Sequence, residues 1–292
     1  MGTTFSVVLH GPDRPRLEVA AKAALDEAHR VDRLLSNYQA TSELSLVNRI
    51  AGREPVGVSS ELFHVLDMAL RYSRESEGAF DMTVGPLMKV WGFYKGEGLL
   101  PKPAEVAGAM KRVGYQRVAL DEPKRTVRFD VPGVELDPGG IGKGYAVDTM
   151  AAVLRQHGIR SAMISAGGSS MYGIGAPPDE SRGWTVPIRS PDGATRTAEE
   201  VFLRDMSLST SGGYEKFFRA GGKVYAHIMD PRTGYPAQGT AAVSVIAPRT
   251  IDSEVWAKPY FINGRAWTER HVRPGFRVFF CADGSRCEWM SQ

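Results

Sequence analysis

The chain has 292 residues, which is enough for one large domain or two closely joined lobes without disulfides or metals. Apolar residues make up 42% and charged residues 24%, and no apolar run is long enough to cross a bilayer, so we expect a soluble globular protein. The formal net charge of +3 is too small to predict nucleic-acid binding, although it is compatible with a small anionic ligand.

The first residues do not resemble a secretory signal. Met1 is followed by Gly2, Thr3 and Thr4, without the basic, apolar and cleavage-site order of a leader. We therefore expect that a leader is either absent or removed, and the compartment stays open.

The first half of the chain alternates between strand and helix patterns. Apolar residues recur at helical spacing between Arg14 and Leu35, among them Val19 and Ala28, and Ser59 can cap a second helix that ends before Gly78. The expected elements, in order, are a strand at 5–9, a helix at 14–35, a helix from 60 to the residues before 78, a helix near 104–112, and strands near 117–120 and 126–130.

The second half is richer in strands. After a Gly-rich turn at 137–144, the expected elements are a helix ending at Gly158, strands at 161–165, 184–189, 200–208, 223–228 and 242–246, a helix near 253–263, and a final hairpin. No repeat or low-complexity linker divides the chain. We therefore predict the α+β class, with residues 1–292 forming a single domain of two lobes.

Four segments are rich in Gly and small polar residues, a composition that lets a backbone approach a phosphate group. They are residues 137–144, 166–169, 209–213 and 227–234. Each segment alone is more often a plain turn, because Gly adopts a positive φ in any turn. Because the chain has four such segments, two interpretations are about equally good: a phosphate cradle, or a set of plain turns.

The first of these segments follows a strand and opens a helix. Its N–H groups and the helix dipole favour an anion, and Lys143 adds a positive charge. The spacing matches neither the P-loop nor the G-x-G-x-x-G fingerprint, and Gly144 stands where a P-loop has Ser or Thr. The residues alone therefore indicate an anion site of unspecified type.

His227 is set among acidic, Arg and Gly residues just before a turn. Beside Asp230 and Arg232 it can act as a proton shuttle whose pKa is tuned by its neighbours. The alternative is a hydrogen-bonded structural histidine, and the pattern alone favours that alternative slightly.

Aromatic residues and cysteines give weaker indications. Tyr38, Phe80 and Tyr94 can stack on a planar ring, but aromatic residues near helix ends more often belong to a core. Cys281 and Cys287 flank a turn signal and can face each other across a hairpin. Two free thiols are the expectation, because a cross-strand disulfide is geometrically demanding.

Taken together and in order, these segments closely resemble the ApbE-like FAD:protein FMN transferases from residue 1 to about residue 264. The match is carried by all four Gly-rich loops and by LSNY at 35–38, SELS at 42–45, FDMTVGPL at 80–87 and WGF at 91–93. The resemblance implies that FAD is bound and that its FMN half is transferred to a Ser or Thr hydroxyl of a target protein, with release of AMP. Family members commonly use magnesium, are secreted or lipid-anchored, and act on subunits of membrane redox complexes.

The resemblance also implies roles for individual residues. The residues that it places at the FAD site are Met1, Tyr38, Ala79, Phe80, Asp81, Asp137, Lys143 and Ile228, with further contacts from the loops that contain Gly167, Gly168, Thr210 and Ser211. His227 matches the catalytic histidine of the family, and Lys143 is the expected phosphate contact.

The metal site departs from the family pattern. That pattern combines a backbone carbonyl with an Asp and with a Thr four residues after the Asp. In this chain the carbonyl belongs to Gly140, Glu254 takes the position of the Asp, and Lys258 takes the position of the Thr. A charged lysine cannot ligate magnesium, so we expect weakened or absent magnesium binding. A shift of helix register that brings Asp252 to the site is a less favoured alternative.

Two interpretations of this departure follow. Glu254 and Lys258 lie at i and i+4 of a predicted helix, which is the favourable orientation for an ion pair. The ammonium of Lys258 can therefore stand in for the metal and neutralise phosphate charge. Alternatively the protein binds FAD without turning it over, or it hydrolyses FAD to FMN and AMP.

Overall fold

The computed structural model describes residues 2–96, 98–192, 196–284 and 286–290. The chain separates into two compact units. Unit 1 contains Asp32–Gly140 and Gly213–Gln238, and unit 2 contains Gly2–Val31, Ile141–Gly212 and Gly239–Gln292. Helices and strands are mixed in the chain, which confirms the predicted α+β class. The single domain at 1–292 stays a prediction.

Unit 2 is built on a seven-stranded sheet in which every neighbouring pair is antiparallel. The strands lie in the order β1 (Phe5–Leu9), β5 (Ala162–Ala166), β6 (Ser170–Ile174), β9 (Met206–Gly212), β14 (Thr240–Ala247), β15 (Arg277–Ala282) and β16 (Glu288–Trp289). A separate hairpin is formed by β7 (Trp184–Arg189) and β8 (Thr197–Leu203).

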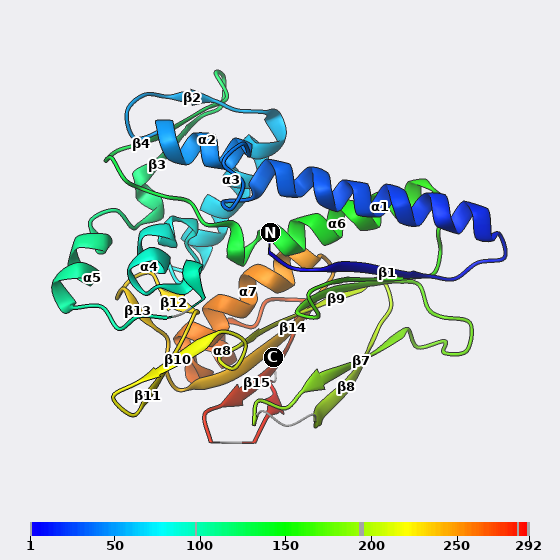
Figure 1. Cartoon of the computed structure of the whole chain (residues 1–292). Coiled ribbons are helices and arrows are strands. Elements are labelled where there is room, and N and C mark those ends of the chain that lie inside the picture. The colour runs from blue at the N-terminus through cyan, green and yellow to red at the C-terminus, as the bar shows by residue number, and fades with distance from the viewer. Residues whose placement is uncertain (1, 97, 193–195, 285, 291–292) are drawn as a thin grey trace. The chain divides into compact units, whose positions relative to one another are not determined.

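The helices α6 (Gly142–Gln156) and α7 (Thr250–Asn263) pack on this sheet, and α1 (Arg14–Leu35) shares a hydrophobic cluster with α6 and the strands (Figure 1). Ala20, Ala24 and Ala28 form the buried stripe of α1 against α6 and the sheet. Alanines at this spacing allow close packing, because they carry no side chain beyond Cβ. Val19, which we expected on the apolar face of this helix, is instead 60% exposed. The short α8 (Arg265–His271) follows α7.

Unit 1 combines short strands with helices. Its three-stranded sheet has the order β2 (Val56–Gly57), β4 (Thr126–Phe129) and β3 (Val118–Asp121), and two hairpins pair β10 (Phe217–Ala220) with β11 (Lys223–Ala226) and β12 (Met229–Asp230) with β13 (Tyr235–Pro236). Its α-helices are α2 (Glu43–Ile50), α3 (Ser60–Glu75), α4 (Gly85–Val90) and α5 (Pro103–Met110). The 3₁₀ turns among its described residues are η1 (Met82–Val84), η2 (Phe93–Lys95), η3 (Tyr115–Arg117) and η4 (Pro138–Gly140).

One hydrophobic core of unit 1 lies between α4, α5 and β12 and forms around an indole. Trp91 is fully buried among Leu87, Val106 and Met229, and its Nε1–H donates to the carbonyl of Gly234 at 2.9 Å. The hydrogen bond satisfies the polar edge of the indole in an apolar setting. It also fixes the turn between β12 and β13, which contains Gly234.

The predicted strand at 200–208 is wrong, because the chain turns inside it. β8 ends at Leu203 and β9 begins at Met206. Between them Asp205 has a φ of +52°, and its carboxylate binds Arg155 at 3.0 Å. Asp tolerates the left-handed conformation better than most residues, so a tight turn is possible without Gly.

The expectation of two free thiols is also wrong, since Cys281 and Cys287 form a disulfide. Phe279 pairs with Trp289 and Phe280 with Glu288 across β15 and β16. The same register places Cys281 opposite Cys287, with their Cα atoms 4.1 Å apart. The hairpin itself therefore supplies the close approach that a disulfide requires.

Among the described residues, no helix combines the length and the apolar character that crossing a membrane requires.

Candidate functional site

Unit 1 holds a polar cluster around Asp137. The Tyr94 hydroxyl donates to Asp137 Oδ2 at 2.6 Å, and the N–H of Gly139 donates to Oδ1 at 2.6 Å. Asn37 donates to the Tyr94 oxygen at 3.1 Å, and the Tyr38 ring meets the Tyr94 ring edge to face. The cluster thus joins the segment after α1, η2 and the first Gly-rich loop.

The electrostatics of the cluster keep both phenols protonated. Burial, followed by the charge of Asp137, raises the pKa of Tyr94 above its ordinary value. The same two causes raise the pKa of Tyr38, whose side chain remains 59% exposed. Tyr38 therefore presents an accessible aromatic face, as a residue that stacks on a flavin or adenine ring must do.

Tyr94 is a residue that sequence reasoning assigned to the core. The structure instead uses its hydroxyl to orient Asp137. The only signal in the sequence was its place two residues after Gly92 in the WGF segment, which does not reveal a partner 43 residues away.

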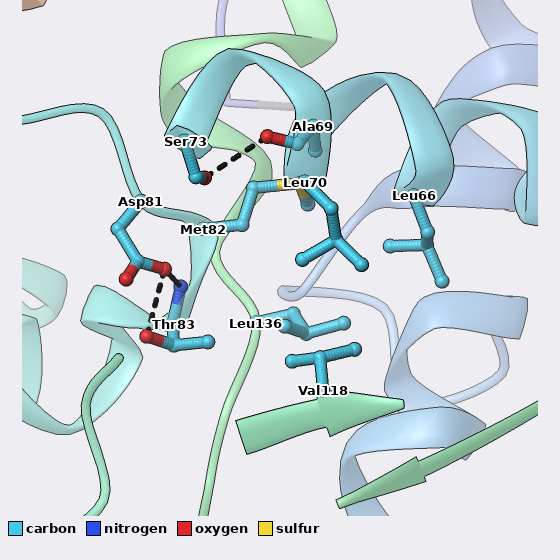
Figure 2. Close-up of a pocket in the computed structure, with 9 residues that line it drawn as sticks. All are labelled: Leu66, Ala69, Leu70, Ser73, Asp81, Met82, Thr83, Val118 and Leu136. Atoms are coloured by element: carbon cyan, nitrogen blue, oxygen red, sulfur yellow. Dashed lines mark hydrogen bonds between the residues drawn. The ribbon is translucent and has the colours of Figure 1, made fainter. Parts of the chain in front are cut away.

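Asp81 lies at the edge of a small pocket in unit 1 (Figure 2). Its Oδ1 accepts from the N–H of Thr83 at 2.7 Å and from the Thr83 hydroxyl at 2.8 Å. Burial raises the pKa of Asp81 to about 6, although these hydrogen bonds act in the opposite direction. Most of the remaining lining is aliphatic, supplied by Leu66, Ala69, Leu70, Met82, Val118 and Leu136. The hydroxyls of Ser73 and Thr83, which complete the lining, donate to the Ala69 carbonyl and to Asp81, so they are not available to a pyrophosphate.

Ala79 and Phe80 precede this pocket and are both buried. The Phe80 ring packs edge to face on Tyr72, and the Phe80 N–H donates to Ser76 Oγ at 3.0 Å. Since the ring is only 4% exposed, stacking of a ligand on Phe80 is not supported. A ligand contact from this segment would have to come from its backbone.

His227 and Ile228 lie between β11 and β12. His227 Nδ1 is 3.2 Å from the carbonyl oxygen of Lys216, and the imidazole meets the Phe93 ring edge to face. Because a carbonyl only accepts, Nδ1 carries a proton in this contact, and Nε2 is the ring nitrogen that can take up a proton. His227 is thus held in the tautomer that a base acting through Nε2 requires.

The neighbours that we expected to tune His227 pair with each other. Arg232 binds both carboxylate oxygens of Asp230, from Nε at 2.9 Å and from an Nη atom at 3.0 Å. This bidentate pair neutralises much of the charge of Asp230. Ile228 is buried, with its carbonyl accepting from Ala237.

Unit 2 holds a second cluster where α6 begins. The ammonium of Lys143 contacts Oε1 of Glu254, and the N–H of Gly144 donates to Oε2 of Glu254 at 2.5 Å. Lys258, one turn further along α7, donates to the backbone carbonyl of Glu254 at 2.8 Å and lies 3.9 Å from Oε1. The predicted Glu254–Lys258 ion pair is confirmed.

Burial shapes the charges in this cluster. It would raise the pKa of Glu254, but Lys143, Lys258 and the Gly144 N–H outweigh it, so the net pKa lies below its ordinary value. Burial lowers the pKa of Lys258 to about 7, against the opposing effect of Glu254. The cluster therefore holds a stable carboxylate and an ammonium that gains from any added negative charge.

Asp148 fixes the position of α7 and was missed by sequence reasoning. Its two carboxylate oxygens accept from the N–H groups of Thr250 at 2.7 Å and Ile251 at 3.0 Å. A carboxylate at the first turn of a helix also complements the helix dipole. Through α7, this contact between two helices orients Glu254.

The remaining predicted residues of unit 2 lie on one turn and on a neighbouring strand. Gly167 and Gly168 form the exposed turn between β5 and β6, with φ of +61° and +68°. Thr210 and Ser211 lie on β9, where the N–H of Thr210 donates to the carbonyl of Ser169 at 2.8 Å. The structure thus brings this turn and this strand together.

The predicted magnesium ligands do not fit a divalent cation. Both carboxylate oxygens of Glu254 are already bound, and an ammonium stands where an oxygen ligand is needed. Asp252, the alternative ligand, pairs with Arg249 at 2.7 Å. Among the described parts of the chain, no group of three His, Cys, Asp or Glu side chains is placed to hold a metal.

Some site predictions stay open. Gly140 ends η4 in unit 1 and Glu254 belongs to unit 2, so their pairing stays a prediction. Met1 lies outside the described residues. The other predicted residues form separate groups in the two units, around Asp137 and His227 in unit 1 and around Lys143 and Thr210 in unit 2.

Comparisons with known proteins identify the same family as the sequence motifs do. The model of the ApbE family matches residues 1–280. A FAD:protein FMN transferase of Treponema pallidum (strain Nichols) is 34% identical over 269 residues, which cover 86% of this chain and 74% of the relative.

Solved structures are similar over almost the whole chain. The crystal structure of the ApbE protein of Thermotoga maritima has a TM-score of 0.89 and 29% identity, and covers 98% of this chain and 93% of its own. The flavinyl transferase ApbE of Pseudomonas stutzeri, in its apo form, has a TM-score of 0.84 and 27% identity, covering 100% of this chain and 91% of its own.

Proposed function

This chain belongs to the ApbE family, and we propose that it is an FAD:protein FMN transferase that moves FMN onto a Ser or Thr hydroxyl of a target protein with release of AMP. The similarity extends over most of the chain and of the relatives that carry this name. The observation in the structure that carries the proposal is the orientation of His227, whose Nδ1 faces the Lys216 carbonyl.

The reaction replaces the phosphoanhydride bond between the two halves of FAD by a phosphate ester bond to the acceptor. The acceptor oxygen attacks the phosphorus of the FMN half, and the bond between that phosphorus and the bridging oxygen breaks. The bridging oxygen leaves on AMP with the electron pair, and the hydroxyl proton passes to Nε2 of His227. A positioned base of this kind typically contributes about 10²–10⁴-fold to a rate.

The other residues position the substrate and stabilise its charge. The ammonium of Lys143 and the Gly-rich start of α6 supply positive charge for the phosphates. Tyr38 offers an exposed aromatic face for a ring of FAD. Asp81, Asp137, Ile228 and the loops with Gly167, Gly168, Thr210 and Ser211 are the further proposed contacts.

Two alternatives share the same binding site. The engagement of Lys143 by Glu254 favours a protein that binds FAD without transfer, because that ammonium is already paired. A hydrolase would use water in place of the acceptor hydroxyl. The partner proposed here is a protein with a Ser or Thr target, such as a subunit of a membrane redox complex.

The proposed function is tested with FAD and a library of peptides that each contain one Ser or Thr. Mass spectrometry should show an added FMN on some peptides, and the matched peptides with Ala at that position should stay unlabelled. Intact FAD with no labelled peptide would contradict the transferase assignment and favour the binding protein. Free FMN and AMP without labelled peptide would favour the hydrolase.

A further inference from the structure

The cluster of Lys143, Glu254 and Lys258 has no evident need for two lysines if its only task is to hold two helices together. A single lysine already satisfies the Glu254 carboxylate, since Lys143 binds one oxygen and the Gly144 N–H binds the other. Lys258 contributes a second ammonium, 3.9 Å from the same carboxylate. The cluster therefore carries two positive charges against one negative charge.

This excess charge is placed in a largely buried position. Glu254 is 1% exposed, and the side chains of Lys143 and Lys258 are 21% and 20% exposed. An unbalanced ammonium is costly in such a setting unless an anion completes it.

Among the described residues, Glu254 is the acidic group within ion-pair distance of Lys258. Asp252 on the same helix is paired with Arg249, and the Asp148 carboxylate accepts from the N–H groups of Thr250 and Ile251. The extra ammonium of Lys258 remains the feature of the cluster that calls for an anionic ligand.

We propose that Lys258, held by Glu254, replaces the divalent cation in this chain, so that FAD phosphate is bound and its charge neutralised without magnesium. This inference rests on the proposed function, which supplies the phosphate ligand. Glu254 acts as a positioning residue that orients both lysines. It is not a metal ligand, because a cation at its carboxylate would have to displace Lys143 and the Gly144 N–H.

The first test measures the affinity for FAD by flavin fluorescence, in EDTA and in millimolar Mg²⁺. The wild-type dissociation constant should differ by less than about twofold between the two conditions, because clusters of three acidic, His or Cys ligands are absent from the described residues and both oxygens of Glu254 are already bound. Calorimetric titration of Mg²⁺ into the protein with saturating ADP should show no uptake. Stoichiometric uptake of Mg²⁺, or FAD binding that is lost in EDTA, would overturn the inference.

Variants separate the charge of Lys258 from its packing. Lys258→Met keeps much of the side-chain volume and should weaken FAD binding by about tenfold in EDTA, whereas Lys258→Arg keeps the charge and should bind better than Lys258→Met. Lys22→Thr is the matched control, because Lys22 forms an exposed i,i+4 pair with Asp26. Melting temperatures report whether each variant folds. The comparison of FAD affinity in EDTA and in Mg²⁺ uses the wild type alone and does not depend on the folding of a variant.

A double variant tests whether the replacement of the divalent cation by Lys258 can be reversed. Glu254→Asp with Lys258→Thr restores oxygen ligands of the kind that magnesium prefers, and Mg²⁺ should then tighten FAD binding by about tenfold or more. Equal Mg²⁺ dependence in the wild type and in this variant would contradict the role of Lys258.

The inference and the proposed function can fail separately. FMN transfer that occurs only with Mg²⁺ would support the transferase and overturn the role of Lys258. FAD bound tightly in EDTA, without transfer to any acceptor, would support the role of Lys258 and contradict the transferase.

Discussion

Gly144 on α6 lies directly against the backbone of Thr250, the first residue of α7. A Cβ atom on Gly144 would stand 2.6 Å from the carbonyl oxygen of Thr250 and 2.7 Å from Cα of Ile251. Real Cβ atoms do not approach backbone atoms so closely, so one of the helices would have to move. The same residue donates its N–H to Glu254, which links this close approach to the cationic cluster.

Gly144→Ala should therefore destabilise the protein by about 3 kcal/mol, because the added methyl group overpacks the contact between α6 and α7. Urea denaturation measures the change. The matched control is Gly108→Ala on α5, where a Cβ meets no atom within 4 Å and a gain of about 0.5–1 kcal/mol is expected. Equal effects of the two substitutions would refute the close approach.

Tyr94→Phe removes the hydroxyl that donates to Asp137 and leaves the ring in place. We expect the free energy of unfolding to fall by about 2 kcal/mol, since hydrogen bonds to charged groups contribute about 1.5–3 kcal/mol. Tyr235→Phe is the control, because Tyr235 is 43% exposed and also keeps its ring contact with Trp91. A Tyr94→Phe variant as stable as this control would show that the hydroxyl does not support Asp137.

The buried carboxyl of Asp81 should make the free energy of unfolding depend on pH. Its pKa in the folded protein is about 6, above the ordinary 3.8, so the folded state binds its proton more tightly than the unfolded state does. The stability that this proton provides is present below pH 4 and is lost as the pH rises to about 6, with a total effect of about 3 kcal/mol. Asp81→Asn, which keeps an oxygen acceptor for Thr83, should remove this loss.

The measurement is the free energy of unfolding of the wild type and of Asp81→Asn at several pH values between 4 and 7. The difference between the two proteins should grow in favour of the variant as the pH rises. Parallel profiles would mean that the Asp81 carboxyl ionises in the folded protein as readily as in the unfolded chain.

His227→Ala should lower the rate of FMN transfer by about 10²–10⁴-fold, because the acceptor hydroxyl loses its base. The dissociation constant of FAD should change by less than about threefold, since the proposed role belongs to the chemical step. His64→Ala, on the exposed side of α3, is the control for removal of an imidazole. Loss of FAD binding in step with loss of rate would assign His227 to binding instead.

The sequence predicted local elements well where periodicity and caps were clear. The helix at 14–35 has the predicted bounds, and Ser59 caps α3 by accepting from the N–H of Leu62. The helix α2 was not predicted, although Ser42 caps it in the same way. Short helices give too few turns for a periodic signal to stand out.

Contacts between distant residues were beyond prediction from a single sequence. The i,i+4 spacing of Glu254 and Lys258 predicted their ion pair, but nothing in the local pattern placed Lys143, 111 residues away, on the same carboxylate. The two cysteines are close in the sequence, and yet their disulfide was not predicted. Their symmetric places about a turn were visible, and the strand register that closes the disulfide was not.

The most direct test of the central claim measures AMP and FMN-labelled acceptor in the same sample during one time course with FAD. FMN transfer that needs no magnesium should give equal amounts of the two products at every time point, in EDTA as well as in Mg²⁺. AMP that accumulates without labelled acceptor, or FAD that stays intact while bound, would contradict FMN transfer as the function of this protein.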